Sequence, residues 1–205
     1  MARRATTVFV TLAAADTVLA GMGRDRPRRA TKPLLMPALM AGSDRSSQRA
    51  LVFGAAGDVA LLSSGDAAFT AGLVSFLAGH IAWIAALRQR RGGGRLRSRP
   101  ALALPYLAAF GALNAYLWQR TGKDRIPVLG YSTALLAMAL TALDTGSPRA
   151  AAGGALFLLS DSLLALEKFA GIQLPGHEGL VMATYTSAQA LLALPRDPEP
   201  GRRRR

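Results

Sequence analysis

Three aspartates lie inside stretches of the chain that are otherwise almost free of charge: Asp16, Asp58 and Asp161. An ionisable side chain at bilayer depth costs about 2.5–3.5 kcal/mol, so such residues usually face the interior of a helical bundle and serve a function. Burial favours the protonated form of a carboxyl group, and two neighbouring carboxyl groups can divide into one acid and one base. Asp58 and Asp161 are therefore our candidates for acid–base chemistry. Asp16 is a weaker candidate, because it lies near a predicted helix end where it can reach water.

Five further polar side chains lie on predicted helices at related depths. At 1.5 Å per residue from the flanking Arg49 and Arg149, Asp58 and Asp161 lie about 14 and 18 Å into a hydrocarbon core about 30 Å thick. Polar residues at related depths in one bundle are expected to converge on a cavity. There, these five would position substrate or water: Lys32, His80, Tyr131, Tyr185 and Gln189.

Several of these side chains also have a simpler structural interpretation. Lys32 can snorkel to the membrane surface as an anchor instead of pairing with an acid or a phosphate. His80 can be a hydrogen-bonding residue of the core. Tyr131, Tyr185 and Trp83 are of the types that form aromatic belts at membrane interfaces.

Two aspartates and one histidine can also ligate a metal ion. However, no second His and no Asp/Glu-x-x-His pattern accompanies His80 on the predicted helices. His177 lies in the predicted loop Pro175-Gly176-His177, where we expect it to be solvated. We therefore expect neither a metal nor an organic cofactor.

The surrounding composition is that of a polytopic membrane protein. The 205 residues are 51% hydrophobic and 18% charged, against about 25% charged in an average soluble domain. Lys and Arg form short clusters between apolar runs, which argues against a disordered chain or a nucleic-acid-binding surface despite the net charge of +13. The absence of cysteine excludes a disulfide framework, a thiolate nucleophile and a zinc–thiolate site. No Walker loop, Gly-x-Ser-x-Gly elbow or dinucleotide fingerprint is present.

The apolar runs predict an all-α bundle of about eight transmembrane helices. The predicted spans are 5–22, 33–42, 50–64, 67–87, 100–119, 126–143, 150–166 and 179–195. The second, Pro33–Gly42, is short enough to be a re-entrant or tilted helix, which would leave seven spans. Residues 1–195 are expected to form one transmembrane domain, and 196–205 a disordered basic tail.

Lys and Arg positions predict the orientation. With both termini in the cytoplasm, the larger share of the 25 Lys and Arg falls on the inner side, although the cluster at residues 24–32 argues the other way. The first span lacks a convincing Ala-x-Ala cleavage site, so we expect it to be retained rather than removed as a signal peptide. The chain is expected to be a multi-pass protein, in the cell membrane if its source is bacterial.

The loop Arg88–Arg99 separates two halves of four predicted helices, and short matches between the halves indicate a parallel internal repeat. The matching segments are Lys32-Pro33-Leu34 with Ile126-Pro127-Val128, Gly57-Asp58-Val59 with Ser160-Asp161-Ser162, and Gly72-Leu73-Val74 with Gly179-Leu180-Val181. In the first pair each proline is expected at a helix start, where its missing N–H costs nothing.

Six motifs occur in an order that resembles a known family. They are Thr31-Lys32-Pro33-Leu34-Leu35-Met36-Pro37, Gly57-Asp58 with Leu61-Leu62, Phe69-x-x-Gly72-Leu73-x-x-Phe76-Leu77-x-Gly79-His80, Pro127-Val128-x-x-Tyr131, Gly154-x-x-Phe157-x-x-Ser160-Asp161 and Thr184-Tyr185-x-x-Ala188-Gln189. In these motifs the chain resembles the YhhN/TMEM86 family of membrane lysoplasmalogenases. It departs from the family pattern at Trp83, where Tyr is expected, and in its Arg/Gly-rich central loop.

The resemblance implies a membrane hydrolase that cleaves the vinyl ether bond of lysoplasmalogens. The products would be a fatty aldehyde and glycerophosphoethanolamine or glycerophosphocholine, so the partners would be a lysophospholipid and the bilayer. Two alternatives stay open at this point. A proton-coupled transporter would use the same buried aspartates as a relay, and a non-enzymatic assembly protein would need them only for stability.

Vinyl ether hydrolysis suits a pair of carboxyl groups. Protonation of the β-carbon gives an oxocarbenium ion, to which water adds before the hemiacetal collapses. An ionised carboxylate would stabilise that cation, as in glycosidases. Asp58 and Asp161 would therefore suffice without a cofactor, with Asp161 preferred as acid and Asp58 as base, although the reverse order fits nearly as well. Lys32 would neutralise the lipid phosphate.

Overall fold

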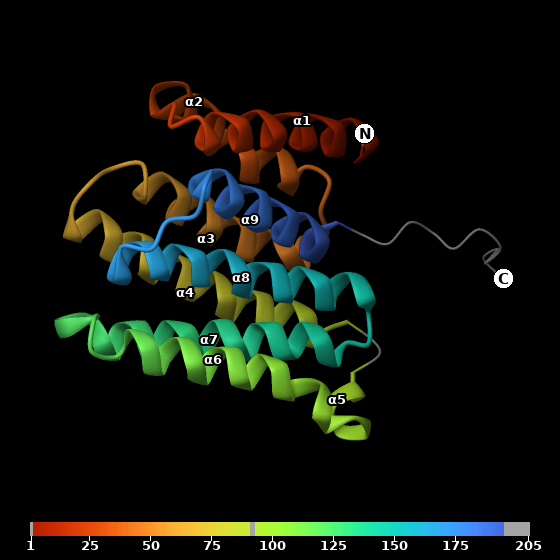
Figure 1. Ribbon diagram of the computed structural model, residues 1–205. Coiled ribbons are helices and arrows are strands. Elements are labelled where there is room, and N and C mark those ends of the chain that lie inside the picture. The colour runs from red at the N-terminus through yellow and green to blue at the C-terminus, as the bar shows by residue number, and fades with distance from the viewer. Residues whose placement is uncertain (1, 91–92, 195–205) are drawn as a thin grey trace, which may run out of the picture.

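The computed structural model describes residues 2–90 and 93–194, and these are helical with short connections and contain no strand (Figure 1). The helices are α1 (Ala2–Gly21), α2 (Asp25–Met40), α3 (Arg45–Ala60), α4 (Asp66–Arg88), α5 (Arg95–Ser98), α6 (Leu104–Leu117), α7 (Arg125–Asp144), α8 (Pro148–Ala170) and α9 (His177–Ala193), with 3-10 turns η1 (Pro100–Ala103) and η2 (Gly122–Asp124). The all-α prediction is confirmed. The predicted tail, 196–205, lies outside the described residues.

Within residues 2–90 and 93–194, four helical stretches are long and apolar enough to cross a membrane, as in an integral membrane protein. They are Asp66–Arg88, Pro100–Leu117, Gly122–Asp144 and Pro148–Ala170. By contrast, α2, α3 and α9 contain 16, 16 and 17 residues. At 1.5 Å per residue they are about 24–26 Å long, slightly less than a hydrocarbon core of about 30 Å.

The long helices lie side by side and alternate in direction (Figure 1). α3 packs against α4, α8 against α9, and α1 against both α2 and α9, while α4 also packs against α7. The α1–α2, α3–α4, α6–α7 and α8–α9 connections lie at the left end of Figure 1, and the start of α1 and the end of α9 lie at the right. This arrangement brings α2, α3, α8 and α9 together at the left end, where the polar residues gather.

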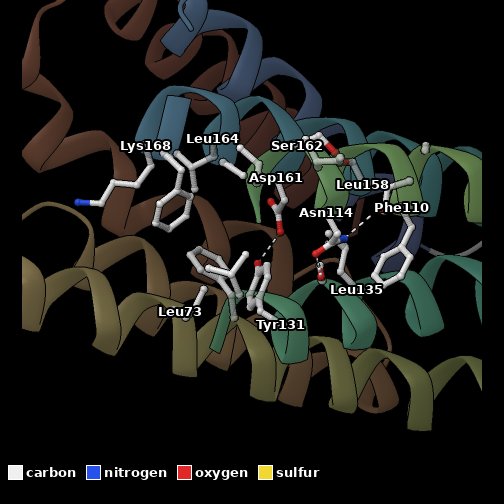
Figure 2. A pocket seen from close by; sticks show the side chains of 18 of the residues that line it. Leu73, Phe110, Asn114, Tyr131, Leu135, Leu158, Asp161, Ser162, Leu164 and Lys168 are labelled. Atoms are coloured by element: carbon white, nitrogen blue, oxygen red, sulfur yellow. Dashed lines mark hydrogen bonds between the residues drawn. The ribbon is translucent and has the colours of Figure 1, made fainter. Parts of the chain in front are cut away.

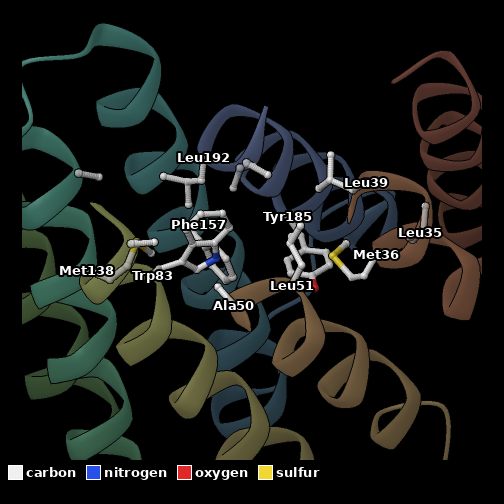
Figure 3. Packing of buried hydrophobic residues seen from close by; sticks show 14 of the residues in the cluster. Leu35, Met36, Leu39, Ala50, Leu51, Trp83, Met138, Phe157, Tyr185 and Leu192 are labelled. Atoms are coloured by element: carbon white, nitrogen blue, oxygen red, sulfur yellow. The ribbon is translucent and has the colours of Figure 1, made fainter. Parts of the chain in front are cut away.

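Close packing holds these helices in register. Gly21 of α1 and Gly179 of α9 face each other, and a Cβ added to Gly179 would lie 3.1 Å from the Gly21 Cα. Small residues at such crossings let membrane helices approach closely. Between α3, α4, α8 and α9, a buried cluster includes Leu51, Trp83 and Phe157 (Figure 3). Rigid side chains in this cluster fix the backbone from which the polar groups project.

Helix ends follow local sequence signals. The Asp44 carboxylate accepts a hydrogen bond from the Ser47 N–H at 2.9 Å and caps α3. Ser147 caps α8, which continues with Pro148. Gly171 ends α8 with a φ of 66°, a left-handed conformation that a side chain disfavours.

The second helix corrects the sequence-based expectation. Instead of a short segment over Pro33–Gly42, α2 runs from Asp25 to Met40 and contains Pro33 and Pro37 in its interior. The prediction that Pro33 starts a helix is therefore wrong, whereas Pro127 does lie in the first turn of α7. Arg26, Arg28 and Arg29, which the sequence analysis placed in a connection, belong to α2. Arg28 and Arg29 line a polar cavity, and Arg28 pairs with Glu178 there. The four-plus-four repeat stays a prediction.

Candidate functional site

A polar cavity of about 1000 Å³ lies between α2, α3, α8 and α9. Its mouth is at the left end of Figure 1, because its lining includes the start of α2, the α3–α4 connection and the start of α9. The charged residues that line it are Asp25, Arg28, Arg29, Lys32, Asp58, Asp161, Glu167 and Glu178. Asp58 and Asp161, the two aspartates proposed for acid–base chemistry, thus line the same cavity.

Asp58 lies at the end of one hydrogen-bond network. The Tyr185 hydroxyl donates to the Asp58 carboxylate at 2.9 Å, and the Lys32 ammonium lies 3.8 Å from its other oxygen. The Gln189 amide N–H donates to the Tyr185 oxygen at 3.3 Å. The Trp83 indole N–H donates to the Gln189 carbonyl oxygen at 3.2 Å. The chain of contacts connects Asp58, on the cavity wall, to the packed core.

Asp161 belongs to a second network. The Tyr131 hydroxyl donates to the Asp161 carboxylate (Figure 2). His80 Nε2 lies 3.0 Å from the Tyr131 oxygen and 3.5 Å from the Asp161 carboxylate. The tautomer of His80 sets the direction of this contact: with its proton on Nε2, His80 donates to the Tyr131 oxygen while the Tyr131 hydroxyl donates to Asp161. His80 Nδ1 is buried without a hydrogen-bond partner.

Phe157 separates the two networks and fixes their geometry. Its ring packs edge-on against His80 at 4.8 Å and against Tyr185 at 5.5 Å between ring centroids. Such edge-to-face contacts orient aromatic side chains as well as burying them. The seven polar residues selected from the sequence therefore lie in two networks, and Phe157 contacts one aromatic member of each, His80 and Tyr185.

The structure decides between the alternatives for several residues. Lys32 is 8% exposed and faces Asp58, so it is not an interface anchor. Trp83 and Tyr185 are 1% and 5% exposed and make hydrogen bonds inside the bundle, so the aromatic-belt interpretation is wrong for them. Tyr131 likewise packs against the core. The expectation of a solvated His177 is also wrong: this residue is buried and accepts a hydrogen bond from the Leu174 N–H.

The sequence analysis did not select Arg28 and gave Asp16 too little weight, and these two residues belong to a third group of charged side chains. Arg28 is buried, and one guanidinium nitrogen lies 2.5 Å from Glu178 and 3.3 Å from Asp25. Arg28 Nε lies 3.7 Å from Asp16, which also accepts a hydrogen bond from Thr31 at 2.6 Å. Asp16 is 0% exposed, so the expectation that it reaches water is wrong. The signal for Arg28 was its spacing: it precedes Lys32 by one helical turn and so shares its face.

A smaller apolar pocket of about 70 Å³ adjoins the cavity between α4, α6, α7 and α8 (Figure 2). Asp161 and Tyr131 line both spaces. The pocket also contains Asn114, whose side-chain carbonyl accepts a hydrogen bond from Ser132 at 3.0 Å. Asn114 was not selected from the sequence, although a lone Asn within the apolar run 100–119 was the available signal.

Among residues 2–90 and 93–194, no three His, Asp or Glu side chains form a group that would hold a metal ion.

Comparisons with known proteins identify one family. The YhhN family model matches residues 27–195. A human lysoplasmalogenase, TMEM86B, is 35% identical over 72% of this chain and 61% of its own length. A lysoplasmalogenase of Mycobacterium bovis is 34% identical over 61% of this chain and 49% of its own length. The chain thus spans between about half and three fifths of these two relatives. No solved structure matches.

Proposed function

Because this chain belongs to the YhhN family, we propose that it hydrolyses the vinyl ether bond of lysoplasmalogens to a fatty aldehyde and a glycerophosphoethanolamine or glycerophosphocholine. The observation that carries the proposal is the position of Asp161 and Tyr131 between the charged cavity and the apolar pocket. A lysoplasmalogen has its vinyl ether where a polar head joins a hydrocarbon chain. A carboxyl group at such a boundary meets that bond when the head lies in the cavity and the chain in the pocket.

In the proposed mechanism Asp161 is the acid. Its carboxyl proton adds to the β-carbon of the vinyl ether, whose double-bond electrons form the new C–H bond. The resulting oxocarbenium ion is stabilised by the neighbouring carboxylates. The role suits Asp161 because it borders the apolar pocket, in which the alkenyl carbons would lie.

Asp58 is the base in this proposal. It accepts a proton from the water that adds to the oxocarbenium carbon, which gives a hemiacetal. Asp161 then takes the hemiacetal hydroxyl proton, the bond to the glycerol oxygen breaks, and the proton on Asp58 passes to that oxygen. Both aspartates regain their starting states. Lys32, 3.8 Å away, supports the role of Asp58 by balancing its negative charge.

The remaining site residues position these groups. His80 and Tyr131 hold Asp161, and Tyr185 and Gln189 hold Asp58, by the hydrogen bonds described above. Lys32 lines the cavity and would also attract the lipid phosphate. From the sequence, the tyrosines and His80 were expected to position substrate or water. We now propose that they orient the two carboxyl groups.

We further propose that residues 1–195 form a single domain that crosses the membrane eight times, with both termini in the cytoplasm. The cavity mouth would then face the non-cytoplasmic side. The burial of Arg28 supports this orientation. The positive-inside rule counts Lys and Arg in the connections, and Arg28 at the start of α2 weighs against an outer position of the α1–α2 connection. Because Arg28 pairs with Asp16 and Glu178, its charge is neutralised and does not oppose that position.

The deciding experiment supplies purified protein in detergent with two lysolipids of equal chain length, one with a vinyl ether and one with an ester. We expect aldehyde from the vinyl ether and no fatty acid from the ester. Absence of aldehyde would refute the proposal. Aspartate-dependent proton uptake into proteoliposomes would then favour the transporter.

A further inference from the structure

The pocket beside Asp161 is lined mainly by apolar side chains of α4, α6, α7 and α8, and its charged residues are Asp161 and Lys168 of α8. α4 contributes Phe69, Leu73 and Phe76, and α6 contributes Phe110, Leu113 and Leu117. Asp161 and Tyr131 line the same pocket from α8 and α7 (Figure 2). The apolar side chains of α4 and α6 therefore line the same space as the carboxyl group of the proposed acid, Asp161.

α6 lies at the edge of the bundle. Only 6% of the Pro100–Leu117 stretch is buried, against 39% of α4. α6 packs against α7 and α8, whereas α4 packs against α3 and α7. Apolar side chains such as Leu104 and Leu107 are exposed on α6, as expected for a helix that faces lipid. The pocket thus lies between the body of the bundle and a lipid-facing helix.

We infer that the pocket between α4 and α6 binds the hydrocarbon chain of the substrate and is the route by which the chain reaches Asp161 from the bilayer. The inference rests on the proposed function, which already places the chain in this pocket, and it adds the side from which the chain enters. A pocket of about 70 Å³ is far smaller than the roughly 300–1,000 Å³ of a site that encloses a small-molecule ligand. It holds only the first carbons of the chain, and the rest of the chain extends into lipid.

The charged cavity is a poor alternative route for the chain. Eight charged residues line it, including Arg28 and Glu178 at the mouth. Moving a chain from lipid through that mouth would expose apolar surface to water at about 25 cal/mol per Å². Moving it from lipid into the pocket exchanges one apolar environment for another. Head and chain would therefore occupy separate spaces that meet at Asp161 and Tyr131.

Because the chain contains no cysteine, single cysteines can test this route directly. Leu113 lines the pocket and is half-buried, and its neighbour Ala112 is exposed and does not line it. We expect Leu113→Cys to lose at least about tenfold in kcat/KM after reaction with a bulky maleimide, and to change little after reaction with a methyl-sized reagent. The control Ala112→Cys should be insensitive to both reagents. Equal responses of the two variants would overturn the inference.

A second readout separates this inference from the proposed reaction. The reaction rate of the same two cysteines with a methyl-sized thiol reagent is measured as a non-cleavable acyl lysophospholipid is added. We expect saturable protection of the cysteine at position 113 and no protection at position 112. Saturable protection in a protein that releases no aldehyde would support the chain site and refute the reaction. Aldehyde release with no protection at either position would overturn the chain site alone.

Discussion

The two aspartates differ most in the charge and polarity of their neighbours. Asp58 faces a lysine ammonium and accepts from Tyr185. Asp161 is held by Tyr131 and His80 and borders an apolar pocket. The proposed division into base and acid rests on this difference: Asp58 has a cation beside it, and Asp161 borders the space proposed for the alkenyl carbons. Two residues that look equivalent in sequence thus have different surroundings.

Removing either acid should stop the reaction. Asp58→Asn and Asp161→Asn keep the size of the side chain but can no longer exchange the proton, so aldehyde release should fall by about 10²–10⁴-fold in each. Purified variants should elute from size exclusion as the parent protein does. Near-parental turnover in either variant would refute the acid–base pair.

Tyr131 should act through Asp161 rather than through substrate binding. Tyr131→Phe removes the hydroxyl that joins His80 to Asp161, so kcat should fall about ten- to hundredfold with little change in KM. Tyr116→Phe, at an exposed tyrosine of α6, is the matched control and should be silent. A rise in KM without loss of kcat would instead indicate a substrate contact.

At the scale of helices, α2 is the element that sequence reasoning placed least well. Its N-terminal half forms one wall of the cavity, with Arg28 and Lys32 one turn apart on the same face. Arg28 connects α2 to Asp16 of α1 and to Glu178 of α9. One buried cation thereby joins three helices and holds the cavity wall in place.

Loss of Arg28 should destabilise the bundle. Arg28→Gln leaves the fully buried Asp16 without its cation, which should lower the free energy of unfolding by about 3 kcal/mol. Asp16→Asn in the same chain should restore most of this loss, since it removes the unpaired charge. Arg26→Gln, on an exposed side chain of the same helix, is the control. Thermal unfolding in detergent measures these three variants and Asp16→Asn alone, and losses that add in the double variant would contradict the pairing.

The start of α3 gives a prediction for pH. Burial alone raises the pKa of Asp44, but hydrogen bonds from Ser46 and Ser47 and the nearby Arg90 outweigh it and hold the pKa below its usual 3.8. Asp44→Ala should therefore cost about 1 kcal/mol at neutral pH through loss of the cap. Since a lowered pKa stabilises the folded state only while the carboxyl is ionised, the difference from the parent should shrink as pH falls below 3.8.

The control for the cap is another acidic residue at a helix start. Asp66 lies in the first turn of α4 and pairs with Lys123, and both side chains are largely exposed. Exposed ion pairs contribute about 0–1 kcal/mol, so Asp66→Ala should have a smaller effect. An equal loss in both variants would argue against a specific cap at Asp44.

At the scale of the whole molecule, the bundle has one polar end and one apolar flank. The cavity mouth lies opposite the end that holds the start of α1 and the end of α9 (Figure 1). The apolar pocket lies beside α6 instead. A lipid with a polar head and a long chain can occupy both spaces together, which a single polar channel would not allow.

Cysteine labelling should establish the proposed orientation. Ser64 lies at the cavity mouth, and Ser98 lies in α5 at the opposite end of the bundle. In vesicles that retain the outward orientation of the cell membrane, a membrane-impermeant thiol reagent should label Ser64→Cys and not Ser98→Cys. The reverse pattern would place both termini outside.

The sequence by itself determined the all-α class, the membrane environment and the short set of polar residues worth attention. These follow from local physics, because apolar runs predict helices and an ionisable residue in such a run is costly wherever it lies. The tertiary structure determined which side chains form hydrogen bonds and ion pairs with each other: Tyr131 with Asp161, Lys32 with Asp58, and Arg28 with Asp16 and Glu178. It also revealed the apolar pocket with Asn114. These features depend on how helices distant in sequence rotate and pack against one another, which no single helix specifies.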